Sequence, residues 1–459
     1  MSGAMLGAVL GAMQVGALAR PGGRRPSYLH PLGMNPAHIG GTALAGLLVS
    51  GGDSRLHIDE ADGRNIYFCP PMPCEELAGF ASCTASPISP EGWEAARCML
   101  GWLDAGADQA AAARALADEL GSLLGVDDLA EILLTASGTD SARLVAALLR
   151  AGAPPTLRGR TMTHVMMAAA ETGSGMPAAA GERVVHVALR DEAGAPRPPG
   201  DIDDDVARLC ARHARPVLHL MVGSKTGIEA PSYLPPGVEV VVDACQGRLA
   251  PERLRGFLRR GWPVMITGSK FYGGPAFAGA LLWPRARALP MPGRTLHGLW
   301  APRLHAGAGR GAAANAPPVG PLLRWAAALE EIRLFTRVPL TAQLSRVATL
   351  AGRVERWIND HPQLAPIDTP SPPGGWPRSI LCFAVRRPDG RLMDMACLRA
   401  VQARLVAAGV LVGQPVAVAP GFGALRIAIG ARSLRDPAIE AKLQRLFAAL
   451  ATPMLIPGE

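Results

Sequence analysis

Lysine is rare in this chain, and a lysine amine can do chemistry that arginine cannot. Of the 46 basic residues, 43 are arginine and only Lys225, Lys270 and Lys442 are lysine. A lysine amine can form an imine with a carbonyl compound once it is desolvated or placed near other charges, whereas the arginine guanidinium stays protonated. Lys442 lies in an amphipathic helical pattern and is expected at the surface. Lys225 lies in the Gly-bounded turn 223–227 and Lys270 ends the segment 267–270, so these two are the candidates for amine chemistry.

The segment 135–141 has the composition of a phosphate-binding turn. It follows the apolar run 132–134, precedes a helical pattern, and contains Gly138, Thr139 and Asp140. A glycine followed by Thr-Asp at a helix start supplies free backbone amides, a hydroxyl and the positive end of the helix dipole. An ordinary helix N-cap has the same pattern. This segment alone therefore does not show whether the turn binds a phosphate or only caps the helix.

Two further strand ends carry Asp243 and Lys270. Asp243 closes the apolar run 238–242, and a carboxylate at the end of a buried strand needs a positive partner. That partner could be an arginine or the start of the next helix, or it could be the protonated ring nitrogen of a cofactor. Thr267 and Ser269 precede Lys270 and can bind the same phosphate as the first turn. An imine-forming amine, a carboxylate for a pyridine nitrogen and a phosphate site are what pyridoxal phosphate requires. The three motifs together therefore predict a pyridoxal-phosphate site at the strand ends of an α/β sheet.

The elements that must position these motifs alternate between strands and helices. Strand patterns cover 163–169, 184–188, 216–222, 237–243, 263–267 and 279–283, and helical patterns cover 94–105, 109–124 and 141–151. This alternation predicts a mostly parallel sheet with helices on both faces. Helical patterns at 322–333, 340–359, 394–408 and 436–450, with strands near 379–386 and 424–430, predict a smaller α+β unit. We expect an N-terminal arm and substrate-entrance segment at 1–92, a large α/β domain at 93–325 and a small domain at 326–459.

Composition and charge narrow the class of protein. A chain of 459 residues with 49% hydrophobic residues can bury a large core. No stretch reaches the roughly 20 apolar residues of a spanning helix, and the apolar run 5–19 has basic residues only after it, the reverse of a secretory signal. We therefore expect a cytoplasmic protein without a membrane partner.

The eight cysteines have no zinc-like spacing, so no metal is expected. The net charge of +8 is scattered and aromatic residues are 5%, which argues against nucleic acid and favours an anionic small-molecule ligand.

The three motifs, in this order, resemble those of fold-type I pyridoxal-phosphate enzymes, in the class V aminotransferase and cysteine desulfurase branch. The resemblance spans roughly residues 77–450 and implies a pyridoxal-phosphate-dependent transferase-like fold. It implies that Lys270 is the Schiff-base lysine, that Asp243 pairs with the pyridinium nitrogen and that Gln246 bonds the ring oxygen. It also implies a set of cofactor phosphate ligands, namely Thr139, Thr267 and Ser269, beside Gly138 and Asp140.

The resemblance also implies where the substrate binds. The segment 80–87, with Thr84 and Ser86, resembles the family's N-terminal segment at the substrate entrance. The segment 424–430 resembles the C-terminal strand whose arginine, here Arg426, grips the substrate carboxylate, although a surface arginine on an edge strand is the plain alternative. A planar guanidinium suits that task because it pairs bidentately with a carboxylate. Gln414 lies in the loop expected before this strand, and Asn315 lies where the family brings in a loop from the partner subunit.

The chain departs from the family's pattern at three places. Where the family usually has a histidine stacked on the ring, this chain has Thr172. Where desulfurases have an Asn-Asn-Glu turn, it has Ser224 as the candidate contact and Lys225 as an extra cation facing substrate or phosphate. The expected loop 412–415 has no cysteine where desulfurases carry their catalytic thiol. Sulfur transfer through a persulfide is therefore not expected.

The resemblance and its departures together predict a homodimeric pyridoxal-phosphate enzyme that acts on an α-amino acid. Lys270 would act as general acid and base after the substrate amine displaces it from the Schiff base, and a carbanion would form at the α-carbon. We favour a lyase or transferase step, elimination or replacement at the β- or γ-carbon, in specialised biosynthesis, with an anionic co-substrate. Transamination by a class V-type aminotransferase, decarboxylation, and a non-catalytic binding protein that keeps the fold are the alternatives.

Overall fold

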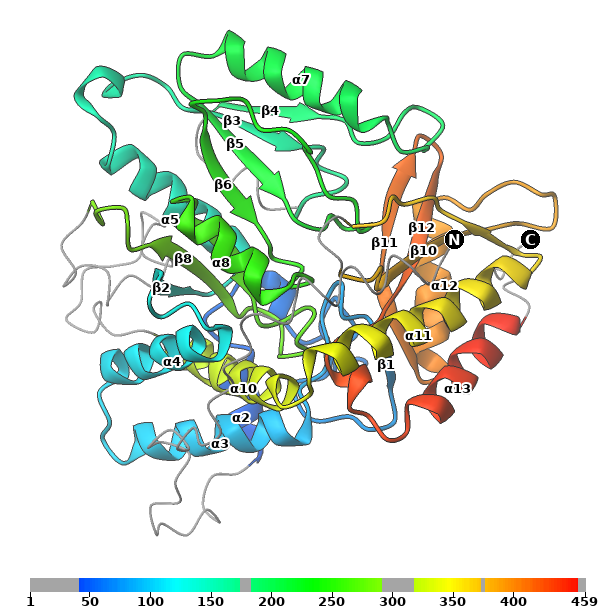
Figure 1. The fold of residues 1–459 in the computed structure, drawn as a ribbon. Coiled ribbons are helices and arrows are strands. Elements are labelled where there is room, and N and C mark those ends of the chain that lie inside the picture. Colours follow the sequence, from blue (N-terminus) through cyan, green and yellow to red (C-terminus); the bar gives the residue numbers. More distant parts are fainter. Residues whose placement is uncertain (1–40, 174–182, 291–317, 373–375, 453–459) are drawn as a thin grey trace.

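A seven-stranded sheet forms the centre of the larger part of the molecule (Figure 1). The computed structural model describes residues 41–173, 183–290, 318–372 and 376–452. The strand order is β2-β8-β7-β6-β5-β3-β4, and only β8 runs antiparallel to its neighbours. The strands are β2 (Ala130–Thr135), β3 (Thr163–Met167), β4 (Arg183–Val187), β5 (Pro216–Met221), β6 (Glu239–Asp243), β7 (Val264–Thr267) and β8 (Gly279–Pro284). The predicted α/β fold with a mostly parallel sheet is confirmed.

Helices cover both faces of this sheet, which explains its nearly continuous apolar strands. On one face, α3 (Pro90–Asp104), α4 (Gln109–Leu124), α8 (Pro251–Arg259) and α10 (Val319–Thr336) pack in one core with Val240 and Val242. On the other, α5 (Gly138–Ala151) packs against Val241, and α7 (Pro199–Arg212) covers the edge with β3, β4 and β5. Because successive side chains of β6 alternate between faces, the two cores meet across one strand.

A second sheet of five strands, in the order β1-β11-β12-β10-β9, lies in the C-terminal part. Its strands are β1 (Ala78–Phe80), β9 (Leu364–Pro366), β10 (Ile380–Val385), β11 (Val410–Ala419) and β12 (Phe422–Ala428), and its helices are α11 (Leu340–Asp360), α12 (Met395–Ala407) and α13 (Ile439–Ala451). Residues 412–415, expected as a loop, lie within β11, and their pairing with β12 is irregular between Gly413 and Val416. Pro415 explains the irregularity because proline has no N–H for the ladder.

The N-terminal part of the described chain packs on the large domain and also adds β1 to the small sheet, parallel to β11. Arg324 on α10 is fully buried and fixes this part. Its guanidinium donates to the carbonyls of Leu48, Ser50 and Gly51 after α2 (Gly41–Leu48), and to that of Phe277 at 2.9 Å. These bonds satisfy carbonyls at the end of α2 and hold residues 50–56 beside the loop that follows Lys270.

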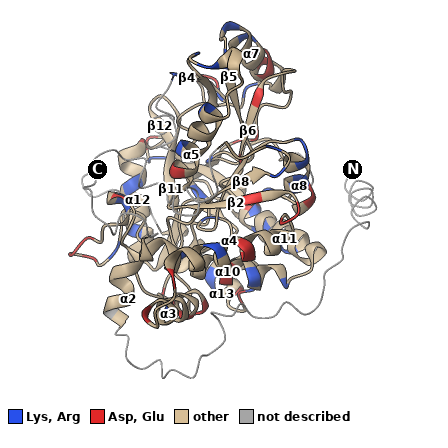
Figure 2. Cartoon of the chain, turned by 90° about the vertical axis from the view of Figure 1, so that its left-hand side faces the viewer, with Lys and Arg blue, Asp and Glu red and all other residues tan. Residues whose placement is uncertain are grey.

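Both α7 and α8 carry acidic residues near their starts and arginines after them (Figure 2), the order that the helix dipole favours. In the described ranges, no helix combines the length and the apolar character needed to cross a bilayer.

Candidate active site

The carboxyl ends of five strands meet at one edge of the large sheet and line a single cleft with two lobes. Lys270, which follows β7, and Asp243, which ends β6, line both lobes. One lobe is also lined by residues after β2 and the other by residues after β3 and β5. This edge is where open α/β sheets bind ligands. The structure therefore brings Lys270 and Asp243 together as the sequence predicted.

The first lobe has the groups of an anion site at the start of α5. Ser137 caps this helix, and Gly138, Thr139, Thr267 and Ser269 line the lobe beside it. A Cβ on Gly138 would lie 2.9 Å from the Cys245 sulfur, so only glycine allows this close approach. The first N–H groups of a helix have no partner within it. They are therefore available to an anion in this lobe.

Asp140 does not line the cleft. Its carboxylate accepts a hydrogen bond from the Ser137 hydroxyl at 2.8 Å and pairs with Arg143 at 3.1 Å. Asp140 thus stabilises the helix start, where a negative charge is favourable, and positions the turn rather than contacting a ligand.

Asp243 and Gln246 lie on the turn after β6. Oδ1 of Asp243 accepts the Cys245 N–H at 3.1 Å, which orients the carboxylate. Gln246 lines the second lobe, but its amide donates to the Cys83 carbonyl at 3.2 Å and accepts from the buried Arg248 at 2.9 Å. Burial lowers the pKa of Arg248 to about 10. Within the described part of the chain, the second N–H of the Gln246 amide has no hydrogen-bond partner.

Arg426 lies on β12, an interior strand of the small sheet, and is buried, so the edge-strand alternative is wrong. Its guanidinium donates to the carbonyls of Gln414 and Lys225 at 2.8 and 3.1 Å and to the Thr84 hydroxyl at 2.8 Å. The Gln414 N–H also donates to Thr84, at 3.2 Å. The irregular pairing of β11 frees these Gln414 groups, and Arg426, Thr84 and Gln414 all line the second lobe.

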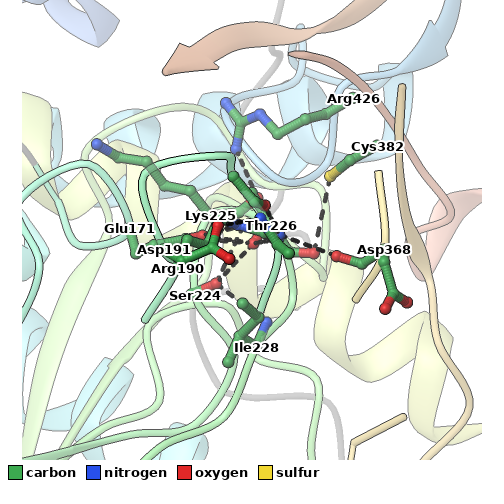
Figure 3. Close-up of polar contacts among 12 residues, drawn as sticks. Glu171, Arg190, Asp191, Ser224, Lys225, Thr226, Ile228, Asp368, Cys382 and Arg426 are labelled. Atoms are coloured by element: carbon green, nitrogen blue, oxygen red, sulfur yellow. Dashed lines mark hydrogen bonds and ion pairs between the residues drawn. The ribbon is translucent and has the colours of Figure 1, made fainter. Parts of the chain in front are cut away.

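Lys225 lies on the turn after β5, held by a buried polar network (Figure 3). Its N–H donates to the Glu171 carbonyl at 2.9 Å, and the next residue, Thr226, donates its hydroxyl and N–H to the Glu171 carboxylate. Arg190 pairs with Glu171 at 3.1 Å and also reaches Thr226. Burial, followed by the nearby charges of Arg426 and Lys270, lowers the pKa of Lys225 to about 8.

Four other candidate residues remain to be placed. Ser224 is buried beneath the cleft lining, because its hydroxyl accepts the N–H groups of Thr226 and Ile228 and so closes the turn. Thr172 lines the second lobe, and its hydroxyl donates to the Ala168 carbonyl at 3.3 Å. Ser86 is half-buried and is not among the residues that line either lobe. Asn315 lies outside the described residues.

The sequence analysis missed residues that come from the N-terminal segment. Arg55 and Tyr67 line both lobes, and Arg55 lies over the Phe277 ring at 4.7 Å. The Asp53 carboxylate accepts from Arg55 at 2.9 and 2.7 Å, and this contact holds the pKa of Asp53 below its usual value. The only sequence signal for Arg55 was its Asp-x-Arg spacing from Asp53, and this spacing is too common in proteins to indicate a site.

Two cysteines line the cleft, Cys83 in the second lobe and Cys245 in both, and Cys245 is not an activated thiol. Cys245 lines both lobes, and burial, followed by the Asp243 charge, raises the pKa of its thiol well above the usual value. A reactive cysteine needs the opposite shift. Within the described ranges, no group of three or more His, Cys, Asp and Glu side chains is arranged to hold a metal ion.

No protein-family model matches the chain, and no curated protein does. Solved structures match over 82% of this chain. The cysteine desulfurase CsdA from Escherichia coli is 18% identical with a TM-score of 0.53 over 95% of its own chain. The cystine C-S lyase C-DES, in complex with cysteine persulfide, is 17% identical with a TM-score of 0.55 over 98% of its chain. TDC from Oryza sativa with PLP is 14% identical with a TM-score of 0.52 over 82% of its chain. The chain therefore has the fold of these structures, the fold-type I architecture that its motifs resemble.

Proposed function

We propose that this protein is a pyridoxal-phosphate enzyme that acts on an α-amino acid. The observation that carries the proposal is the placement of Lys270 and Asp243 in one cleft, at the ends of the adjacent strands β7 and β6. The shared fold supports it, since solved structures with this fold include a desulfurase, a C-S lyase and a PLP-bound TDC.

The residues present fit this cofactor. The lobe at the start of α5 would take its phosphate through Gly138, Thr139, Thr267 and Ser269, because hydroxyls and helix amides suit an anion. Among the described residues, no hydrogen bond engages the Lys270 amine, so this amine is available.

The residues of the cleft have separate tasks in this reaction. Pyridoxal phosphate, when bound, supplies an aldehyde for the substrate amine and a ring that withdraws electrons from the bonds of the α-carbon. Asp243 would hold a proton on the ring nitrogen, since a carboxylate stabilises a nearby positive charge. The Lys270 amine would hold the cofactor and then move a proton at the substrate α-carbon. Arg426 would bind the α-carboxylate.

For the reaction type, we propose elimination or replacement at the β- or γ-carbon, with an anionic co-substrate, in small-molecule biosynthesis. The proposal includes a homodimer and a cytoplasmic location, without membrane or nucleic-acid partners. The raised thiol pKa of Cys245, which lines both lobes, supports a route in which this cysteine carries no persulfide. The second candidate is a class V-type aminotransferase, which the cofactor and carboxylate groups would serve equally, and the third is a binding protein that keeps the fold.

The test is the visible absorption spectrum of the purified protein with added pyridoxal phosphate, before and after borohydride. We expect a band that reduction abolishes and a covalent label that maps to Lys270. Lys270→Ala should lose the label, and Lys442→Ala, which removes the ion-paired lysine of α13, should keep it. No band and no label in the wild-type protein would contradict the proposed function.

The same samples separate the reaction types. Amino acids added one at a time should change the spectrum when they bind, and recovery of the original band on adding a keto acid would identify the aminotransferase. A bound cofactor whose spectrum no amino acid changes would favour the non-catalytic alternative.

A further inference from the structure

Several cations line the cleft, and most of them already have a partner or an assigned task. Arg55 is paired with Asp53 at 2.7 Å. Lys270 and Asp243 are assigned to the cofactor in the proposed function. The remaining carboxylate of the second lobe, Glu171, is buried and neutralised by Arg190. Among the described residues that line the cleft, Arg426 and Lys225 are therefore the positive charges left for a substrate.

Arg426 has donors left for one carboxylate only. A guanidinium has five N–H donors, and three of those on Arg426 bind Gln414, Lys225 and Thr84. The two that remain match the two oxygens of a single carboxylate. A substrate whose α-carboxylate accepts both remaining N–H donors of Arg426 thus leaves the Lys225 charge without an anionic partner.

Lys225 is placed to face the substrate rather than the cofactor phosphate. It lines the second lobe with Arg426, whereas Gly138, Thr139, Thr267 and Ser269 line the first lobe. Its backbone is fixed at both ends, by the Glu171 carbonyl at 2.9 Å and by Arg426 at 3.1 Å. Its side chain extends away from the network around Thr226 (Figure 3).

The Lys225 amine is poorly compensated where it lies. Its one hydrogen bond within the described part of the chain goes to the Ala169 carbonyl, at 3.4 Å, and no carboxylate of that part is close enough to pair with it. The Lys225 side chain is half-buried, and a positive charge partly withdrawn from water without a carboxylate partner is unfavourable. An anion that entered the lobe would therefore gain a charge-assisted contact.

We propose that Lys225 binds a second anionic group, so that the substrate is an amino acid whose side chain ends in a carboxylate or phosphate. This inference rests on the proposed function and names its substrate class. Arg426 takes the α-carboxylate, and Lys225 takes the anion at the other end of the substrate. Neutral amino acids of the same length bind more weakly because they leave the Lys225 charge unpaired.

The test uses unreactive acids, so that it measures binding rather than turnover. Calorimetry compares glutarate and 3-phosphopropionate with valerate, on the protein with pyridoxal phosphate and on the protein without it. We expect both dianions to bind at least about tenfold more tightly than valerate. Lys225→Met should reduce this preference to about threefold or less without weakening valerate binding, and Lys225→Arg should keep much of it. Lys442→Met is the matched lysine control and should not change any affinity.

The preference should also depend on pH. Because the pKa of Lys225 is lowered to about 8, its charge is present below pH 8 and is lost as the pH rises. The groups that act on it, Arg426, Lys270 and Glu171, remain in the Lys225→Met protein. The wild-type preference should therefore fall from pH 7 to pH 9 by several-fold more than that of Lys225→Met.

The outcomes separate this inference from the proposed function. If Lys225→Met and Lys225→Gln both keep the wild-type preference for dianions, the inference is overturned even when the cofactor band is present. If no cofactor binds, the proposed function fails, and the titration of the cofactor-free protein still decides whether Lys225 is the second anion site. A preference for glutarate over 3-phosphopropionate would assign a carboxylate, and the reverse would assign a phosphate.

Discussion

Glu171 holds the turn that brings Lys225 to the second lobe of the cleft. Its carboxylate is buried, pairs with Arg190 at 3.1 Å and accepts two donors of Thr226, the residue after Lys225. Breaking a buried pair by removing one partner leaves the other charge uncompensated, at a cost of about 3 kcal/mol or more. Glu171, which also lines the second lobe, therefore positions the backbone of Lys225 through these contacts.

We expect Glu171→Gln to lower the free energy of unfolding by about 3 kcal/mol, measured by urea denaturation. Asp205→Asn is the control, because Asp205 pairs with Arg197 and Arg208 in a partly exposed site and should cost less than about 1 kcal/mol. Equal losses in the two variants would show that the Glu171 network does not stabilise the turn.

At the level of elements, β11 shows how an irregular strand shapes the lining of the cleft. Pro415 interrupts the ladder, and the freed N–H and carbonyl of Gln414 bind Thr84 and Arg426. Gly413 is part of the same device, since a Cβ there would lie 2.4 Å from the Cys83 sulfur and 3.2 Å from the Arg426 Cβ. Only glycine at position 413 leaves room for β11 to pass between these two side chains.

Gly413→Ala should therefore displace Arg426 and weaken the binding of a monocarboxylate such as valerate about tenfold, measured by calorimetry. Forcing a methyl into a packed site costs about 1–3 kcal/mol, so the melting temperature should fall as well. Gly79→Ala, on the adjacent strand β1, is the control, because its Cβ would meet nothing within 4 Å. Unchanged valerate binding in Gly413→Ala would refute the role of this strand in positioning Arg426.

The sequence predicted the elements whose patterns are regular and the residues that end them. The apolar runs before Asp243 and Lys270 indicated β6 and β7, and the parallel order then placed both residues at one edge. By contrast, β11 was missed, because Gly413 and Pro415 interrupt its strand pattern. Arg55 was missed because its place depends on contacts that no local pattern records.

Ser224 illustrates the converse problem. Its position in the turn before Lys225 made it a candidate contact, but a serine hydroxyl in a turn can also satisfy nearby backbone amides. Here it accepts the N–H groups of Thr226 and Ile228. Only the three-dimensional structure distinguishes these two uses of the same residue type.

On the scale of the whole molecule, the cleft depends on contacts that join the part built on the seven-stranded sheet, the part built on the five-stranded sheet and the N-terminal segment. Arg248, in the large domain, contributes one such junction. Its guanidinium donates to the Gln246 amide oxygen at 2.9 Å, to the Ser82 hydroxyl at 2.8 Å and to the Ser379 hydroxyl at 2.9 Å. These partners belong to three segments far apart in the chain, and Gln246 itself lines the cleft.

Replacing Arg248 should therefore affect both stability and cofactor binding. Arg248→Met leaves several buried polar groups without a donor, and each such group costs about 1–3 kcal/mol. We expect the free energy of unfolding to fall by about 2 kcal/mol and the affinity for pyridoxal phosphate to fall several-fold, because Gln246 loses the contact that orients it. Arg248→Lys keeps a charge but lacks the planar fork that reaches three acceptors, so it should rescue only part of both losses.

The control for this variant is Arg255→Met, which removes a surface arginine that pairs with Asp128 on the same domain. Exposed pairs contribute about 0–1 kcal/mol, so this protein should bind cofactor as the wild type does. If Arg248→Met loses stability while its cofactor affinity is unchanged, Arg248 joins the segments without shaping the cleft. If both properties fall together, the binding of the cofactor and the junction of the three segments are coupled, because one buried guanidinium serves both.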